Sequence, residues 1–91
     1  MHIVNLLITL DLPYVKSKKG RRKIINSIKE RLSKHNLSIL DISSEYPKEA
    51  EIAIAFLSLS EIDAKKKIQT IEKILDRYFS DVEYSISYEI L

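Results

Sequence analysis

The stretch from Ala50 to Leu59, AEIAIAFLSL, decides the fold because both of its alternating faces are apolar. Ile52, Ile54 and Phe56 fall on one face of a strand, and alanine and leucine residues fall on the other. Side chains of a strand alternate with a period of two, so two apolar faces indicate a strand covered on both sides. The sequence therefore predicts a central strand here.

A helix and a last strand follow this central strand. Ser60, with Asp63 three residues later, resembles a capping box with aspartate in place of glutamate. The residues after it have the three- and four-residue spacing of a buried helix face. They are Ala64, Ile68, Ile71, Leu75 and Tyr78. The last strand begins at Asp81, and alternation gives it one apolar face. That face carries Val82, Tyr84, Ile86, Tyr88 and Ile90.

The first half of the chain repeats the pattern of strand, helix and strand. A first strand from Met1 to Leu12 has one strongly apolar face and ends near Pro13, which has no amide hydrogen. Ser17 caps a helix that runs to about Asn36. Its apolar stripe consists of Ile24, Ile25, Ile28 and Leu32. A second strand, from Leu37 to Ser44, carries apolar residues on both faces: Leu37 and Ile39 on one, Leu40 and Ile42 on the other.

The resulting order, β-α-β-β-α-β, is that of the split βαβ, ferredoxin-like fold of the α+β class. We expect a four-stranded antiparallel sheet with the first and third strands central and both helices on one face. The chain shows no linker, internal repeat or low-complexity segment, so we expect a single domain over residues 1–91.

Composition excludes several classes of function. The chain has no cysteine, which rules out disulfides, thiol catalysis and thiolate zinc sites. Its single glycine, Gly20, rules out nucleotide-binding glycine loops. The sequence shows no export signal and no membrane segment, so we expect a cytoplasmic protein without a membrane partner.

Three segments resemble the YlxP-like proteins, small bacterial proteins with no assigned activity. The segment from Ser17 to Arg22 resembles the S-L-K-[DE]-K-R opening of their first helix, although Lys18 replaces leucine and Gly20 replaces the acid. Residues 36–42, NLSILDI, resemble their N-V-S-V-A-E-V strand, and the final E-I-L is shared. Their genes often lie beside those of translation initiation and ribosome maturation factors. The resemblance therefore implies a role connected with translation or ribosome assembly.

Charge is distributed unevenly along the chain. The segment from Lys16 to Lys34 holds nine basic residues and one acid, a charge of +8, whereas the remainder carries −6. Such a field attracts phosphate groups or an acidic partner toward the first helix. The unpaired amides at the helix start add to this attraction. The candidate anion or nucleic-acid site is Ser17, Lys18, Lys19, Gly20, Arg21, Arg22, Lys23 and Lys29.

Three interpretations of the basic helix remain open: RNA or another anion, an acidic protein partner, and a merely solvated face. If RNA or a ribosomal particle binds, we expect weak, salt-sensitive contact with the backbone, because the central strands lack the aromatic residues that stack bases.

No catalytic, metal or cofactor site is recognisable in the sequence. His2 and His35 lie far apart, and metal ligation needs three or four convergent donors. The serines lack a plausible base, and the glycine-rich anion loop of acylphosphatases is missing. We therefore predict a non-enzymatic protein without a cofactor.

The uncovered face of the sheet suggests self-association. Two helices cover one sheet face, and the other is expected to expose Ile3, Leu7, Leu37 and Ile39. An apolar patch of this size is unusual on a monomer. We expect a homodimer, formed face to face or through an edge strand, with a monomer as the alternative. A dimeric interaction or small-ligand-sensing module is thus the alternative to an RNA-associated factor.

Overall fold

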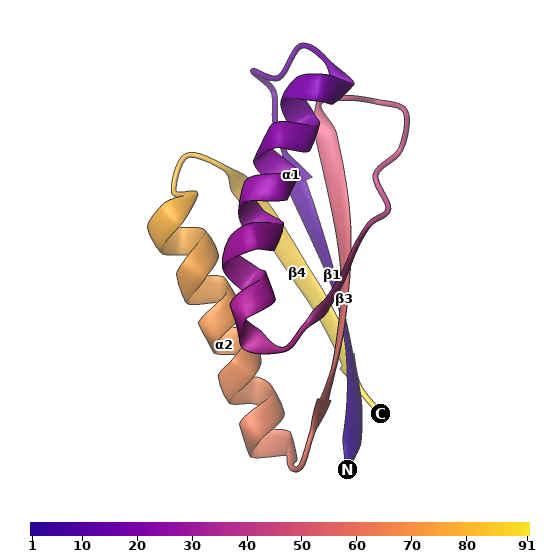
Figure 1. The fold of residues 1–91 in the computed structure, drawn as a ribbon, viewed down its shortest axis with the longest axis vertical. Coiled ribbons are helices and arrows are strands. Elements are labelled where there is room, and N and C mark those ends of the chain that lie inside the picture. Colours follow the sequence, from indigo (N-terminus) through magenta and orange to yellow (C-terminus); the bar gives the residue numbers. More distant parts are fainter.

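A computed structural model describes all 91 residues and contains four strands and two helices (Figure 1). The first half contains β1 (His2–Asp11), α1 (Lys18–Leu32), a 3₁₀ turn (Ser33–His35) and β2 (Ser38–Asp41). The second half contains β3 (Glu49–Ser58), α2 (Glu61–Tyr78) and β4 (Glu83–Ile90). This order is the predicted one.

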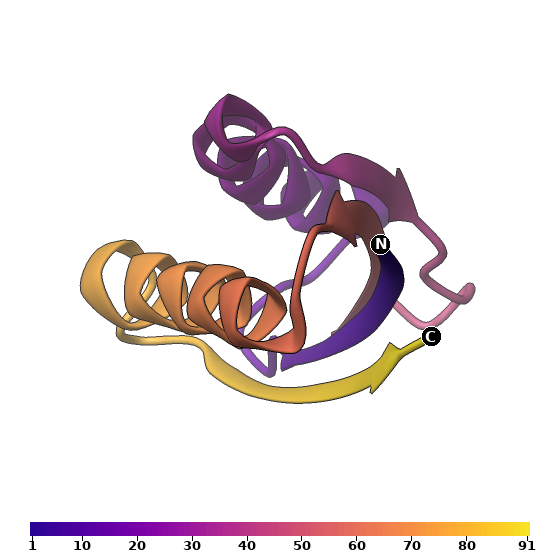
Figure 2. The same cartoon turned by 90° about the horizontal axis from the view of Figure 1, so that it is seen from below.

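The strands form one antiparallel sheet in the order β2-β3-β1-β4. Both helices cover the same face, α1 on the side of β2 and β3 and α2 on the side of β4 (Figure 2). The predicted ferredoxin-like fold is therefore confirmed. The opposite face of the sheet, called the open face below, has no helix over it.

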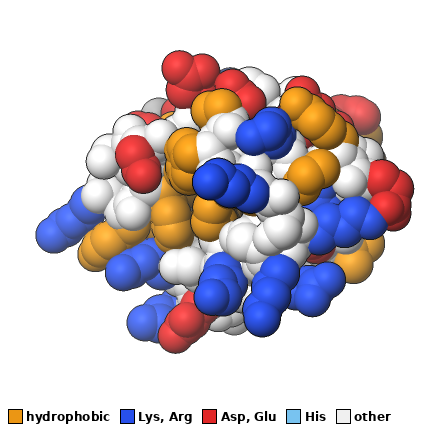
Figure 3. Space-filling view, turned by 90° about the horizontal axis from the view of Figure 1, so that it is seen from above, with side chains coloured by type: hydrophobic (Ala, Val, Ile, Leu, Met, Phe, Trp, Pro, Cys, Tyr) orange, Lys and Arg blue, Asp and Glu red, His pale blue; other side chains and the backbone are white.

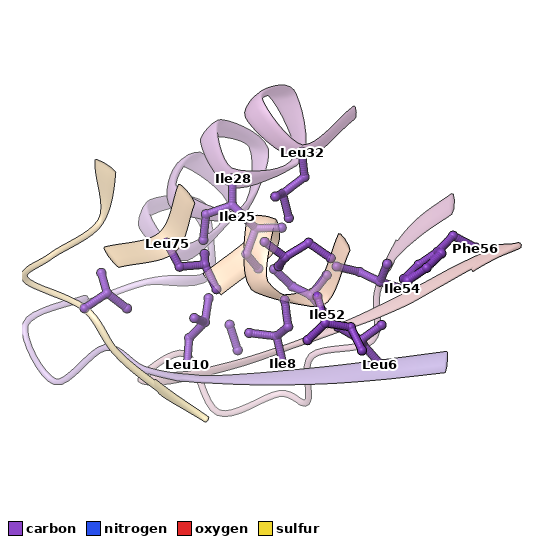
Figure 4. Close-up of a cluster of buried hydrophobic side chains, with 14 of the residues drawn as sticks. Leu6, Ile8, Leu10, Ile25, Ile28, Leu32, Ile52, Ile54, Phe56 and Leu75 are labelled. Atoms are coloured by element: carbon purple, nitrogen blue, oxygen red, sulfur yellow. The ribbon is translucent and has the colours of Figure 1, made fainter. Parts of the chain in front are cut away.

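The core lies between the sheet and the helices, and Figure 4 shows its central side chains. Each central strand contributes one alternating face. The buried strand residues are Val4, Leu6, Ile8, Leu10, Ala50, Ile52, Ile54 and Phe56. The helices meet them with one stripe each. These stripes consist of Ile25, Ile28 and Leu32 in α1 and of Ala64, Ile68, Ile71 and Leu75 in α2.

Local signals set both helix starts as expected, whereas α1 ends at Leu32, four residues before the predicted end at about Asn36. The Ser17 hydroxyl accepts a hydrogen bond from the Gly20 amide at 3.1 Å, and the Ser60 hydroxyl accepts one from the Asp63 amide at 3.1 Å. Asn36 adopts the left-handed conformation with φ of 55°, which ends the 3₁₀ turn after α1.

The structure corrects the prediction for the second strand in length and in orientation. β2 spans only Ser38–Asp41, and its register pairs Ile39 with Ile54, so Ile39 faces the helices. Leu37 and Ile39 pack against the core, whereas Leu40 is 64% exposed on the open face. The prediction that Leu37 and Ile39 belong to an exposed interface is therefore wrong. Pairing with β3 turns Ile39 of β2 toward the helices, and Leu37, just before β2, packs against the core as well.

Candidate nucleic-acid interface

The start of α1 carries the predicted serine cap, which occupies the Gly20 amide. The Gly20 amide donates to the Ser17 hydroxyl, and the Arg21 amide donates to the Ser17 carbonyl at 3.1 Å. A Cβ at Gly20 would lie 3.5 Å from the Ser17 hydroxyl and 3.7 Å from Val15, which are ordinary contact distances, so the packing here does not require a glycine. The Gly20 amide is therefore engaged within the protein and does not face a ligand, whereas a role of Ser17 in an anion site stays a prediction.

Arg21 belongs to the structure of the fold and not to a binding surface. It is only 7% exposed, and its Nη1 donates to the Tyr46 carbonyl at 2.7 Å and to the Glu49 carbonyl at 3.1 Å. These bonds tie α1 to Tyr46, between β2 and β3, and to Glu49, the first residue of β3. The sequence contained the signal for this burial, since Arg21 precedes Ile25 by four residues and Ile28 by seven. The prediction that Arg21 contacts an anion is therefore wrong.

The flank of α1 that faces β2 lies near acidic residues. Lys18 pairs with Glu45, and the hydrogen bond and charge of Lys18 hold the pKa of the Glu45 carboxyl below its usual value. Burial raises the pKa of Asp41, but hydrogen bonds from Ser43 and the charges of Arg21 and Lys29 outweigh it and lower that pKa. Lys18 and Lys29 are thus partly compensated within the protein.

The outward side of α1 differs from the flank that faces β2, because its cations have no acidic partner. Lys19, Arg22 and Lys23 are exposed, and no carboxylate oxygen lies within 4.0 Å of their nitrogens. Lys34, just beyond the helix, is exposed as well. Figure 3 views the end where α1 begins and shows Lys and Arg side chains gathered along one side. We call Lys19, Arg22, Lys23 and Lys34 the basic face.

Arg31 does not belong to the basic face, because it is engaged with the other helix. Its guanidinium carbon lies 3.6 Å from the centroid of the Tyr78 ring, near the end of α2. This cation–π contact joins the two helices at the surface. The cations of the basic face are therefore the exposed ones outside these pairings, and Lys23 among them lines the same hollow as Phe79 at the end of α2.

One end of the open face is negatively charged, in contrast to the positively charged basic face. Asp11 lies beside Glu49 on one side and Glu83 on the other, so three carboxylates form a row across β3, β1 and β4. No group of three or more His, Cys, Asp or Glu side chains is placed to hold a metal ion. This carboxylate row repels a polyanion from the end of the open face.

Aromatic residues do not form a base-stacking platform on the open face. The register pairs Tyr84 with Leu10 and Tyr88 with Leu6, which places both tyrosines on the helix-covered side. Phe56 is buried in the core. Together with the carboxylate row, this leaves the basic face of α1 as the surface suited to a nucleic acid.

Neither helix is both long and apolar enough to cross a membrane. Comparison with curated proteins finds no match.

The fold is similar to those of designed and natural solved structures. A de novo designed protein with a ferredoxin fold is 14% identical with a TM-score of 0.63, covering 99% of this chain and 85% of its own. The designed protein Foldit4 is 11% identical with a TM-score of 0.59, and the match covers 98% of this chain and 97% of Foldit4. A dimeric ferredoxin-like protein from an uncultured marine organism is 17% identical with a TM-score of 0.56, and the match covers 100% of this chain and 93% of the marine protein. These likenesses show the fold.

Sequence comparison places the chain in a family. The model of the family described as "Protein of unknown function (DUF503)" matches residues 3–88, nearly the whole chain. The protein therefore belongs to the DUF503 family.

Proposed function

We propose that this protein is a non-enzymatic, cytoplasmic factor that binds the RNA backbone weakly through the basic face of α1. The observation that carries the proposal is the set of cations on α1 that no carboxylate compensates, in a chain whose remaining residues are net acidic. The resemblance to YlxP-like proteins supports a role connected with translation or ribosome assembly.

Phosphate is the chemistry that fits the basic face. Lys and Arg side chains neutralise phosphates and release counterions, which makes binding depend steeply on salt and little on sequence. If each of the four cations contacts one phosphate of a single strand, affinity falls with a slope of about −3 against the logarithm of salt concentration. The carboxylate row on the open face orients the molecule so that α1 meets the RNA.

The test compares equal charge changes on the two helices. Lys19→Glu with Arg22→Glu removes two cations of the basic face, and Lys65→Glu with Lys66→Glu changes the net charge equally on exposed positions of α2. Anisotropy with a labelled single-stranded oligoribonucleotide measures the affinity. We expect a loss of about tenfold or more for the α1 pair at low salt, with a flatter salt slope.

The α2 pair is expected to retain most of the affinity. Equal losses in both pairs would mean that binding follows net charge alone and would contradict the proposal. A salt slope near zero in the unaltered protein would also contradict it. Competition with polyglutamate separates RNA from an acidic protein partner, since the basic face of an RNA-binding factor is expected to prefer the oligoribonucleotide.

Association with ribosomal particles is a separate measurement. We expect the protein to sediment with ribosomal particles from a lysate at low salt and to leave them at high salt. The α1 charge-reversal pair is expected to stay in the supernatant at both salt concentrations. Sedimentation of that variant with the particles would contradict a role for the basic face.

A second candidate function is a homodimeric interaction module. The observation in its favour is the outer edge of β4, which no other strand of the chain pairs. The solved marine protein with this fold is described as dimeric. Self-association is expected to survive charge reversal on α1, which separates this candidate from the first.

A further inference from the structure

Apart from the charges of Glu83 and Glu89, the outer edge of β4 lacks the features that usually protect an edge strand. β4 is eight residues long, EYSISYEI, and contains neither lysine nor proline. Its register with β1 runs without a bulge from the Asp11–Glu83 pair to the Val4–Ile90 pair. The other edge strand, β2, is only four residues long. Long, regular edges without such protection pair readily with another strand.

We propose that a second copy of this chain pairs with β4, antiparallel, around a two-fold axis at Ser87. The product is an eight-stranded sheet with all four helices on one side. This inference rests on the homodimer proposed above and specifies its surface and register.

Free backbone groups lie along this edge at alternate residues. The Leu91 amide donates to the Ile3 carbonyl at 2.9 Å, so the odd-numbered residues of this segment direct their backbone groups toward β1. The amides and carbonyls of Tyr84, Ile86, Tyr88 and Ile90 therefore point outward. They supply the donors and acceptors of an antiparallel ladder with the second copy.

Symmetry limits the possible registers. Two antiparallel edge strands are related by an axis normal to the sheet, which keeps helix-facing residues opposite helix-facing residues. The axis then passes through a residue pair, and only Ile86 and Ser87 lie near the middle of β4. Centres farther along the strand pair fewer residues.

Charge selects between these two centres. An axis at Ile86 places Glu83 opposite Glu89 of the second copy, and like charges directly opposite each other are unfavourable. An axis at Ser87 places Glu89 opposite Ser85 of the second copy and leaves Glu83 at the end of the ladder. It also brings Ile86 beside Tyr88 of the second copy, an aliphatic–aromatic pair. The geometry therefore favours Ser87.

Full face-to-face stacking is disfavoured by the same carboxylates. Two open faces in complete contact would bury the row of Asp11, Glu49 and Glu83 without cationic partners. Pairing through β4 leaves this row in water. Ile3 and Leu7, which do lie on the open face, are then outside the interface.

A dimer of this form has a consequence for RNA. Both helices cover the same face of one sheet (Figure 2). An axis normal to the sheet therefore leaves the basic faces of both copies on the same side of the joined sheet. One RNA is then able to contact both copies, so dimerisation increases the number of phosphate contacts.

Single cysteines test the register, since the chain has no cysteine of its own. At the proposed axis Ser87 faces its own copy in a non-hydrogen-bonded pair, where Cα atoms are about 4.5 Å apart and a disulfide fits. Ser87→Cys is expected to form a covalent dimer under mild oxidation. Ser85→Cys is the matched control on the same exposed side of β4, and its two copies would lie about four residues apart along the ladder.

The outcomes separate the register from the dimer. Crosslinking by Ser87→Cys and not by Ser85→Cys supports the proposal. Crosslinking only in a mixture of the two variants would place the axis at Ile86 and overturn the register. Equal crosslinking by both variants, or no crosslinking by either variant alone or by their mixture, would overturn pairing through β4. None of these results depends on RNA, so a failure of RNA binding is recognised separately.

Sedimentation tests the association without a crosslink. At high micromolar concentration we expect a particle of twice the 10.6 kDa chain mass. Tyr88→Pro removes an outward amide that the β1–β4 ladder does not use, so it is expected to give a folded monomer by circular dichroism. A monomeric unaltered protein, or a folded Tyr88→Pro variant that remains dimeric, would overturn the proposal.

Discussion

The two helices share their architecture and differ in the charge of their first turn. Each begins at a capping serine whose hydroxyl accepts an amide hydrogen bond at 3.1 Å, and each buries one apolar stripe on the same sheet face. α2 has Glu61 and Asp63 in its first turn, as the helix dipole favours. α1 has no acid there and is basic instead.

The comparison of the two first turns shows that the fold does not need the positive charge at the start of α1. The cap and the buried stripe are present in both helices, so they account for both helices forming on the sheet. Basic residues at a helix start oppose the dipole by roughly 0.3–1 kcal/mol each. The charges of α1 therefore run against helix stability, which is the pattern expected where a surface is kept for an anionic partner.

The largest expected effect tests what the helices share. Ile28 in α1 and Ile71 in α2 are both fully buried. Ile28→Ala and Ile71→Ala are each expected to lower the free energy of unfolding by about 2–5 kcal/mol, through lost burial and the cavity that remains. Urea denaturation measures the change. A loss below 1 kcal/mol for Ile28→Ala alone would show that α1 is not packed as α2 is.

The next prediction separates two neighbouring arginines of α1. Arg21→Met removes the bonds to the Tyr46 and Glu49 carbonyls and is expected to lower the free energy of unfolding by roughly 1.5–3 kcal/mol. Arg22→Met, at an exposed site, is expected to change it by less than about 0.5 kcal/mol.

RNA affinity is expected to show the reverse order for these arginines. Arg22→Met weakens binding, whereas Arg21→Met leaves the affinity of the folded fraction unchanged. Anisotropy under conditions in which both variants are folded measures this. A stronger loss of affinity in Arg21→Met would contradict the separation of structural and binding cations.

The polar contacts beside the two helices respond to opposite changes of pH. The Tyr84 hydroxyl donates to Asp76 of α2 at 2.6 Å; burial, this bond and the Asp76 charge raise the pKa of Tyr84 to about 12. Because this value exceeds the ordinary 10.0, the stabilisation is complete below pH 10 and is lost as the pH rises toward about 12. Beside α1, the lowered pKa of Glu45 gives a contribution that is lost in acid.

Denaturation as a function of pH checks this contrast. Tyr84→Phe is expected to flatten the decline of stability between about pH 10 and 12, and to leave the acid side unchanged. Glu45→Gln is the matched change for the acid side. An unaltered alkaline profile in Tyr84→Phe would contradict the role of the Tyr84–Asp76 bond.

The smallest expected effect bears most directly on the comparison. Lys19→Glu gives α1 the first-turn acid that α2 has, and is expected to raise the free energy of unfolding by about 0.3–1 kcal/mol. Glu61→Lys in α2 is expected to lower it by a similar amount. Thermal melts at low ionic strength measure both. If Lys19→Glu instead destabilises the protein, the charges of α1 serve its folding and the comparison fails.

The order of elements, both capping serines and the left-handed Asn36 were readable from the sequence. These features depend on periodicity and on hydrogen bonds between residues a few positions apart, so a local pattern contains them. The excess of positive charge between Lys16 and Lys34 was readable in the same way. The charge of the segment does not depend on how it packs.

Only the tertiary structure decided which face of β2 is buried and which cations of α1 are free. β2 has apolar residues at both alternations, so its facing comes from the pairing of Ile39 with Ile54 on another strand. Arg21 and Lys18 are engaged by groups at least 25 residues away, in the segment between β2 and β3. Contacts between distant segments produce no periodic pattern in the sequence of either segment. The partners of these residues are therefore known only from the tertiary structure.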